Sequence, residues 1–146
     1  MLIDDTTHAW NFAFADLTVG QTVEQIVAFS QRDVKAFGDL VGDHAAVHFD
    51  PQHAQSMGYS GPIVHGLLIS SRFSRLMGMF LPGPQSVIQG LQLKFTRSVP
   101  VGVPVIFRAR IKSCSPAVRA VILEMSAAID GSIAVSAVGT CTFPTR

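Results

Sequence analysis

The feature that most constrains the fold is an abrupt change of pattern at Pro82-Gly83-Pro84. Before this break, residues 64–80 place apolar side chains at helical spacing around much of the circumference, which predicts one long buried helix. One helix followed by strands predicts an α+β fold with an antiparallel sheet wrapped around a central helix. Segments rich in Val, Ile and Phe predict those strands at residues 86–96, 105–112, 119–129 and 133–143.

Shorter strands and turns complete the predicted sheet. Residues 10–14 and 22–29 are predicted strands on either side of a turn at residues 18–20. Asp130-Gly131 predicts a tight hairpin between the last two strands. No repeat, linker or composition break interrupts the chain, so we predict a single domain over residues 1–146.

Two short helices are predicted ahead of the long one. Ser30 and Asp33 have the spacing of a capping box, which predicts a helix over residues 31–40. Asp50-Pro51 combines an N-cap residue with a proline at the first helical position, and it predicts a second helix over residues 51–57. The elements that precede the long helix are therefore short and mixed in type.

Composition narrows the classes of function. Among the 146 residues, 48% are hydrophobic, yet no run approaches the roughly 18 apolar residues that a membrane span needs. Mean hydropathy is +0.37, and this apolar surplus favours burial against a second copy, so we expect a homodimer. A net charge of +1 without a basic run argues against a nucleic-acid partner.

The first ten residues and the cysteines bear on the cellular compartment. The segment MLIDDTTHAW carries two Asp and no basic residue, which argues against a secretory signal. Cys114 and Cys141 lie in apolar segments typical of strands, where reduced thiols are expected. Nothing in this pattern favours a disulfide between them, so we expect a cytoplasmic protein.

The candidate chemistry centres on Asp43 and His48, five residues apart in a chain with only 14% charged residues. Five residues of α-helix rotate by about 500°, so the pair converges only if the chain turns between them. Gly42, which suits a left-handed helix end, and the helix start at Asp50 favour such a turn. One group then activates a water held between them while the other gives a proton to carbon. The alternative is that Asp43 caps a turn and His48 is structural.

Gly66, near the start of the long helix, is a candidate oxyanion donor. An N–H in the first helical turn has no intrahelical partner, and the positive end of the helix dipole lies behind it. A glycine also lets a ligand carbonyl approach the backbone closely. The alternative is that Gly66 only allows close packing of the helix on the sheet. The adjacent His65 either lines a site or caps a nearby carbonyl.

Three serines, Ser70, Ser71 and Ser74, interrupt the apolar helix. Their default role is to bond back to helix carbonyls, and Ser74 can also reach a catalytic side chain. The chain has no G-x-S-x-G elbow, no H-E-x-x-H pattern and no glycine-rich phosphate loop after a strand. We therefore expect no serine-hydrolase site, no metal and no nucleotide cofactor.

With these residues placed, the chain resembles the MaoC-like acyl dehydratases, and among them the (R)-specific enoyl-CoA hydratases of the hot-dog fold. The resemblance covers almost the whole chain after about residue 29. It rests on GDHAAVH at residues 42–48, PIVHG at 62–66 and QGLQLKFTRSVPVGVPV at 89–105. It implies a hot-dog domain that adds water syn to a trans-2-enoyl thioester of CoA or acyl carrier protein, or the reverse dehydration of a (3R)-hydroxyacyl thioester.

The resemblance also implies the roles of single residues. Asp43 and His48 would hold and activate the water, and the N–H of Gly66 would polarise the thioester carbonyl. Ser74 falls where the family has a serine near the pair. No cofactor is implied, and the implied assembly is a homodimer in which the thioester arm enters at the interface.

One departure from the family pattern leaves several functions open. Ala45-Ala46 stand where the family has Asn-Pro, which changes what holds the loop between Asp43 and His48. An active hydratase with an altered substrate range, a slow one, or a fold relative with another reaction all fit this change. A hot-dog thioesterase and a non-catalytic relative that binds acyl thioesters are the rival functions.

Overall fold

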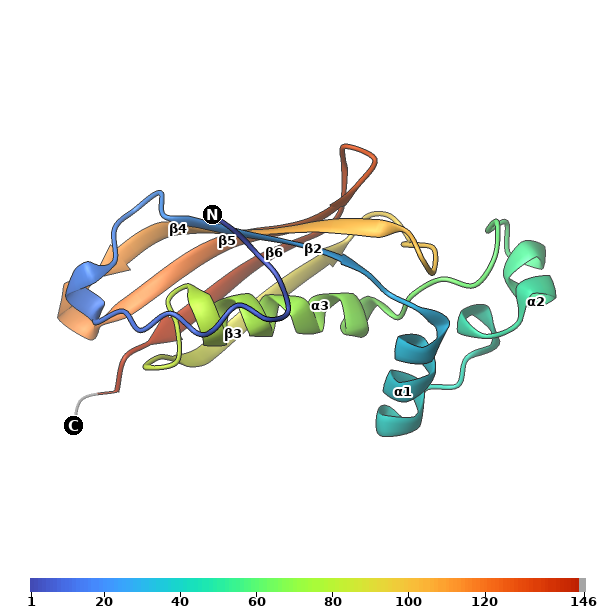
Figure 1. The fold of residues 1–146 in the computed structure, drawn as a ribbon, viewed down its shortest axis with the longest axis horizontal. Coiled ribbons are helices and arrows are strands. Elements are labelled where there is room, and N and C mark those ends of the chain that lie inside the picture. Colours follow the sequence, from blue (N-terminus) through green and yellow to red (C-terminus); the bar gives the residue numbers. More distant parts are fainter. Residues whose placement is uncertain (145–146) are drawn as a thin grey trace.

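The computed structural model describes residues 1–144, in which one curved six-stranded sheet covers a central helix (Figure 1). The strands are β1 (Leu2–Ile3), β2 (Thr22–Ala28), β3 (Val87–Phe95), β4 (Pro104–Ser115), β5 (Ala120–Ile129) and β6 (Ser132–Thr142). The α-helices are α1 (Gln31–Val41), α2 (Pro51–Ser56) and α3 (Gly66–Arg75). Short turns of other helical types are η1 (Phe14–Asp16), η2 (Ala46–His48), η3 (Leu76–Phe80) and η4 (Pro116–Val118). The predicted order of one helix followed by four long strands is confirmed.

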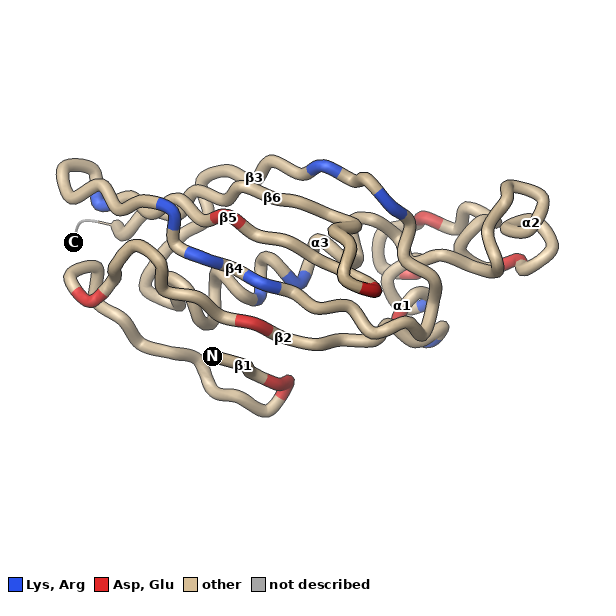
Figure 2. The backbone as a smooth tube through the Cα atoms, turned by 90° about the horizontal axis from the view of Figure 1, so that it is seen from above, with Lys and Arg blue, Asp and Glu red and all other residues tan. Residues whose placement is uncertain are grey.

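The sheet has the strand order β1-β2-β4-β5-β6-β3 (Figure 2). All neighbours are antiparallel except β1 and β2, which run parallel. The hairpin between β5 and β6 turns at Asp130 and Gly131 with φ of 49° and 74°, as predicted. β3 pairs with β6 and not with β4, the next strand along the chain. This pairing was not predicted, because the residue pattern within a strand does not determine which other strand it pairs with.

The prediction of a strand at residues 10–14 is wrong, whereas the strand predicted at residues 22–29 is confirmed as β2. The backbone N–H of Trp10 donates to the carbonyl of Met79 at 2.9 Å, and no ladder forms there. The Trp10 ring packs edge-on against Phe80 at 5.5 Å between ring centres. The aromatic pattern therefore reflects side chains that cover the end of the central helix.

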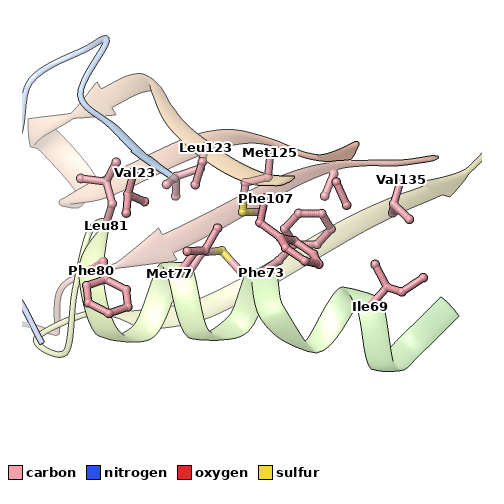
Figure 3. Packing of buried hydrophobic residues seen from close by; sticks show 14 of the residues in the cluster. Val23, Ile69, Phe73, Met77, Phe80, Leu81, Phe107, Leu123, Met125 and Val135 are labelled. Carbon is pink, nitrogen blue, oxygen red and sulfur yellow. The ribbon is translucent and has the colours of Figure 1, made fainter. Parts of the chain in front are cut away.

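The centre of the fold is the contact between the sheet and one face of the helix formed by α3 and η3 (Figure 3). Phe73, Met77 and Phe80 on the helix are fully buried, as is Phe107 on β4. Phe73 meets Phe107 edge-on at 5.8 Å between ring centres. These large side chains explain why a helix with this spacing is held under the sheet.

The central helix begins near His65 and Gly66 and runs to Phe80, as predicted, but it differs from the prediction in its last turn and on one face. It begins at Gly66, because His65 has an extended backbone with φ −57° and ψ 133°. Its last turn, η3, is π-helical. The helix is buried on one side only, and Leu67 on the other side is 62% exposed. The apolar residues around the helix therefore form two faces. The sheet covers one face, and the other is exposed in the single chain.

Residues 31–64, with α1, η2 and α2, form an arm beyond the end of α3 (Figure 1). The capping box is confirmed: Asp33 N–H donates to Ser30 Oγ at 3.2 Å, and Ser30 N–H donates to the Asp33 carboxylate at 2.8 Å. Gly42 ends α1 with φ 78°, as predicted. Asp50 caps α2 by accepting from two backbone N–H groups. Local capping thus sets the shape of the arm.

The outer face of the sheet carries paired charges (Figure 2). Arg108 on β4 pairs with Glu24 at 2.6 Å, and Lys112 pairs with Glu124 at 2.8 Å. The basic residues of β4 are in this way partly balanced by acidic residues on the neighbouring strands. Among residues 1–144, no helix is long and apolar enough to cross a membrane.

The two cysteines are free, as expected. Cys114 on β4 lies opposite Val121 on β5, and Val121 lies opposite Cys141 on β6. Two strand spacings separate their Cα atoms by about 9–10 Å, which exceeds the reach of a disulfide. Burial raises the pKa of the Cys141 thiol to about 11, so this thiol is protonated and unreactive near neutral pH.

Candidate active site

Asp43 follows the glycine that ends α1, where the chain turns toward η2. Its side chain accepts a hydrogen bond from the N–H of Ala45 at 3.2 Å, which closes a local turn. The side chain is about half exposed, so one carboxylate oxygen is free to meet a ligand or water. The turn-capping interpretation of Asp43 is confirmed, and its accessible carboxylate leaves the catalytic interpretation as a prediction.

His48 ends η2 and is half-buried. Its Nδ1 lies 2.8 Å from the carbonyl oxygen of Ile63. A carbonyl only accepts, so this bond assigns the ring hydrogen to Nδ1 and leaves a lone pair on Nε2. His48 is thus held in the tautomer that a general base requires.

His65 is the residue that joins these two groups. It is only 2% exposed, and its Nε2 lies 3.0 Å from the Asp43 carbonyl oxygen and 4.0 Å from the Asp43 carboxylate. Its ring stacks on the ring of His48, with 3.8 Å between centres and 27° between planes. Sequence reasoning left the role of His65 open between lining a site and capping a carbonyl. The structure shows the capping contact with the Asp43 carbonyl, and it does not place His65 in the lining of the pocket that holds His48 and Gly66. Its place directly before the helix-start glycine was the available signal.

Asp43, His48 and His65 form a group of potential metal ligands, whose ligand atoms lie within 4.8 Å of one another. Each imidazole already has one nitrogen against a backbone carbonyl. Rings that are stacked nearly parallel direct their remaining nitrogens along separate planes, whereas a metal needs lone pairs that meet about 2 Å from each nitrogen. The arrangement suits a water molecule between a carboxylate and an imidazole better than it suits a metal ion.

Gly66 and His48 line the same pocket, which has a volume of about 320 Å³. The other lining residues come from the segment before α3, from Ile69 within α3, and from Phe95 at the end of β3 with the residues that follow it, including Arg97. Among residues 1–144, no hydrogen-bond acceptor lies against the N–H of Gly66, which heads α3. This N–H and the helix dipole behind it offer a donor to a carbonyl in the pocket.

The absence of a side chain at Gly66 also matters for packing. A Cβ atom there would lie 2.8 Å from Cε1 of the Phe95 ring. The close-packing interpretation of Gly66 is therefore confirmed, and it is compatible with the oxyanion role, which stays a prediction. The approach of Phe95 depends on sheet pairing at the far end of β3, so the sequence offered no signal for it.

The serines of α3 follow their default role in part. Ser70 Oγ donates to the carbonyl of Gly66 at 2.9 Å, and Ser71 Oγ donates to that of Leu68 at 2.6 Å. Ser74 is exposed and lies about 12 Å along the helix axis from Gly66. The single chain thus brings His48 close to Asp43 and into one pocket with Gly66, although Asp43 itself does not line that pocket. Among the described residues it leaves Ser74 apart from them.

The arrangement supports acid/base chemistry beside a carbonyl. The carboxylate of Asp43 and the imidazole of His48 are close enough for one water to bond to both. The free Nε2 of His48 can take a proton, and the N–H of Gly66 can stabilise negative charge on a carbonyl oxygen nearby. A nucleophilic side chain activated by a base is not among the groups that converge here in the described part of the chain.

Comparison with known proteins identifies the family. The model of the MaoC like domain matches residues 14–124. The chain belongs to this family. The predicted resemblance to the MaoC-like acyl dehydratases is therefore confirmed.

Two curated relatives carry related names. The chain is 41% identical over 86 residues to the (R)-specific enoyl-CoA hydratase of Aeromonas caviae, a match that covers 59% of this chain and 64% of the relative. It is 36% identical over 78 residues to the mitochondrial 3-hydroxyacyl-[acyl-carrier-protein] dehydratase of Arabidopsis thaliana, covering 53% and 47%. The matches thus span about half to two-thirds of these relatives.

Solved structures confirm the hot-dog fold. The (R)-hydratase of A. caviae involved in PHA biosynthesis superposes with a TM-score of 0.84 at 32% identity. This superposition covers 88% of the present MaoC-like chain and 98% of the other. The sheet wrapped around α3 is therefore the hot-dog architecture that was predicted.

Proposed function

We propose that this MaoC-like protein is a hydro-lyase that adds water reversibly to a trans-2-enoyl thioester and gives a (3R)-hydroxyacyl thioester. The observation that carries the proposal is the convergence of the Asp43 carboxylate and the His48 imidazole beside the N–H of Gly66. The names of the relatives support the same reaction, and they include hydratases and dehydratases.

In the proposed reaction, Asp43 and His48 hold one water between them. Nε2 of His48 takes a proton from this water as its oxygen bonds to C3 of the enoyl group. Electrons move to the thioester oxygen, where the N–H of Gly66 stabilises the enolate. The pair then returns a proton to C2, so that no net proton is gained or lost. Because the pair lies on one side of the substrate, both atoms add to the same face.

Ser74 remains a proposed supporting residue. Its exposure and its distance along the helix suit contact with the substrate or with a second copy of the chain better than contact with Asp43. Substitution of Ser74 by Ala tests this, and we expect a smaller loss of rate than substitution within the pair produces.

The test of the proposed function is to mix the purified protein with crotonyl-CoA. Absorbance of the enoyl thioester is followed while a thiol reagent is assayed in parallel. We expect the enoyl band to fall without release of thiol. Release of thiol would assign the protein to the hot-dog thioesterases, and binding without either change would assign it to the non-catalytic relatives. A carrier-protein thioester is tested in the same way, because the substrate arm is proposed to be CoA or acyl carrier protein.

We also propose a homodimer formed along β3. This strand is at the edge of the sheet, and its outer side has no partner strand within residues 1–144. Val87 and Phe95 on it are about half exposed, and Leu67 of α3 is 62% exposed. An exposed apolar edge strand is a surface that proteins normally cover. Light scattering after size exclusion should give twice the chain mass of 15.7 kDa, and a monomer would contradict the proposal.

The proposed compartment is the cytoplasm. Free Cys114 and Cys141, too far apart to be joined by a disulfide, suit a reducing environment. Fractionation of cells that express the tagged protein tests this directly, and recovery in a membrane or secreted fraction would contradict it.

A further inference from the structure

We infer that His65 is a positioning residue that sets the relative placement of Asp43 and His48. The inference rests on the proposed function, because it assigns His65 a role in the same reaction. His65 is only 2% exposed and does not line the pocket that contains His48 and Gly66, so it is not expected to touch the substrate, whereas the Asp43 side chain is about half exposed. Its contacts are instead with the groups that carry out the chemistry.

The first contact fixes the loop that carries Asp43. Nε2 of His65 lies 3.0 Å from the Asp43 carbonyl oxygen, and since a carbonyl only accepts, the ring hydrogen is on Nε2. The other bonds that tie this loop to the rest of the chain lie at its far end, where Ile63 N–H donates to the Val47 carbonyl and the Gln31 side chain donates to that of His48. The side chain of Asp43 bonds only within the loop, to the N–H of Ala45. His65 therefore provides the bond that ties the backbone of Asp43 to the start of α3.

The second contact fixes the ring of His48. The bond from Nδ1 of His48 to the Ile63 carbonyl holds one point of the ring but leaves it free to swing about that bond. The face of His65, 3.8 Å away and tilted by 27°, removes this freedom. The lone pair on Nε2 of His48 is thus aimed in one direction.

The surroundings of His65 hold it in turn. Its ring lies 5.0 Å from that of Phe37 on α1 and 5.9 Å from that of Phe49, which follows His48. Gly38, one residue further along α1, would bring a Cβ within 2.9 Å of the Asp43 carbonyl oxygen. His65 therefore links α1, the Asp43 loop and the first residue of α3, with little room to move.

The second ring nitrogen of His65, Nδ1, makes no contact that would explain a histidine at this position among the described residues. This nitrogen is buried and has no hydrogen-bond partner there. An apolar ring at this position would leave no such atom, and a buried acceptor without a partner destabilises the fold. The histidine is therefore explained by the hydrogen bond that its Nε2–H donates to the Asp43 carbonyl.

Two variants separate the two contacts. His65→Phe keeps a ring to stack on His48 and loses the N–H, whereas His65→Gln keeps an N–H at similar reach and loses the ring. We expect each to lower kcat for hydration at least about tenfold, because misplacement by about 1 Å can cost a hundredfold. KM should stay within about twofold, since His65 is outside the pocket. His53→Phe, on the exposed surface of α2, is the matched control and should keep both constants.

Nitrogen NMR of the wild-type protein tests the inference without a variant. We expect the hydrogen of His65 on Nε2 and that of His48 on Nδ1, and in His65→Gln the signal of His48 should shift. The opposite tautomer of His65, or a wild-type kcat in folded His65→Phe, would overturn the inference. If the wild-type protein hydrates no enoyl thioester, the proposed function fails, and the NMR result still decides whether His65 orders this pair.

Discussion

The sheet with α3 and the arm of residues 31–64 are built in different ways. Under the sheet, large apolar side chains such as Phe73, Met77 and Phe107 are fully buried. In the arm, the fully buried side chains are small, such as Val34 and Ala54, and the helices depend on caps. Apolar burial thus stabilises the fold in one region, while hydrogen bonds and stacking set the geometry of the other.

This difference divides stability from chemistry. The proposed acid/base pair belongs to the arm, whereas the proposed oxyanion donor Gly66 heads the central helix of the other region. A substitution at Asp43 or His48 should therefore affect activity far more than stability, and a substitution under the sheet should do the reverse. The site lies where the two regions meet, and His65 is the buried link between them.

The largest expected effect is on the pair itself. Asp43→Asn and His48→Ala should each lower kcat about 10²- to 10⁴-fold, because each removes a group that handles a proton in the transition state. The free energy of unfolding should change by about 0.5 kcal/mol or less for the half-exposed Asp43. Enoyl-thioester kinetics and denaturant unfolding measure the two effects. An Asp43→Asn variant that is fully active, or one that is unfolded, would contradict the separation of activity from stability.

The converse substitution lies under the sheet. Phe73→Ala removes a fully buried ring that packs against Phe107, and should lower the free energy of unfolding by about 3–5 kcal/mol. Denaturant titration measures this loss. Activity per folded molecule should change little, and a loss of stability below about 1 kcal/mol would show that the core is not built as described.

Gly66 lies where the two regions meet, and Gly66→Ala sharpens the comparison. The added Cβ would lie 2.8 Å from the Phe95 ring, which must move because the helix backbone is held. Displacement of this ring in the pocket should lower kcat about ten- to a hundredfold, with a change in stability below about 1 kcal/mol. Steady-state kinetics measure the loss, and the Gly66→Ala/Phe95→Ala double variant should recover most of it. Full activity in the single variant would exclude any role for this close approach.

The smallest expected effect is at the cap of α1. Ser30→Ala removes the hydroxyl that bonds Asp33 and should cost about 1 kcal/mol of unfolding free energy. The same bond lowers the pKa of Asp33 from the usual 3.8. The capping contribution is therefore present above the unfolded-state pKa and is lost as pH falls through the lower folded value. Between pH 6 and pH 3, the free energy of unfolding should fall less in Ser30→Ala than in the wild type. An equal fall in both proteins would show that the bond from Ser30 to Asp33 does not contribute to the pH dependence.

The parts of the fold that depend on local pattern were predictable from the sequence. Strong periodicity located α3 and the four long strands, and specific residues such as Ser30 and Gly42 located the ends of α1. The strand predicted at residues 10–14 failed because aromatic side chains that cover a helix end look like those of a strand. The position of β3 beside β6 depends on long-range pairing, which no local pattern carries.

The candidate site was predictable in its residue types but not in its construction. The spacing of Asp43 and His48 and the helix start at Gly66 named three groups that the structure brings together. The stacking of His65 on His48 and the approach of Phe95 to Gly66 join residues far apart in sequence or set ring orientations. Such contacts depend on the packing of the arm against the sheet and α3, which local sequence patterns do not specify.

The most direct test of the central claim is the stereochemistry of hydration in D₂O. A trans-2-enoyl thioester is converted by the wild-type protein, and the H2–H3 coupling in the deuterated 3-hydroxyacyl product is read by NMR. One water held between Asp43 and His48 on one side of the substrate predicts syn addition, and therefore a single diastereomer with one H2–H3 coupling constant. Anti addition, or a mixture of both, would contradict a pair that acts from one face.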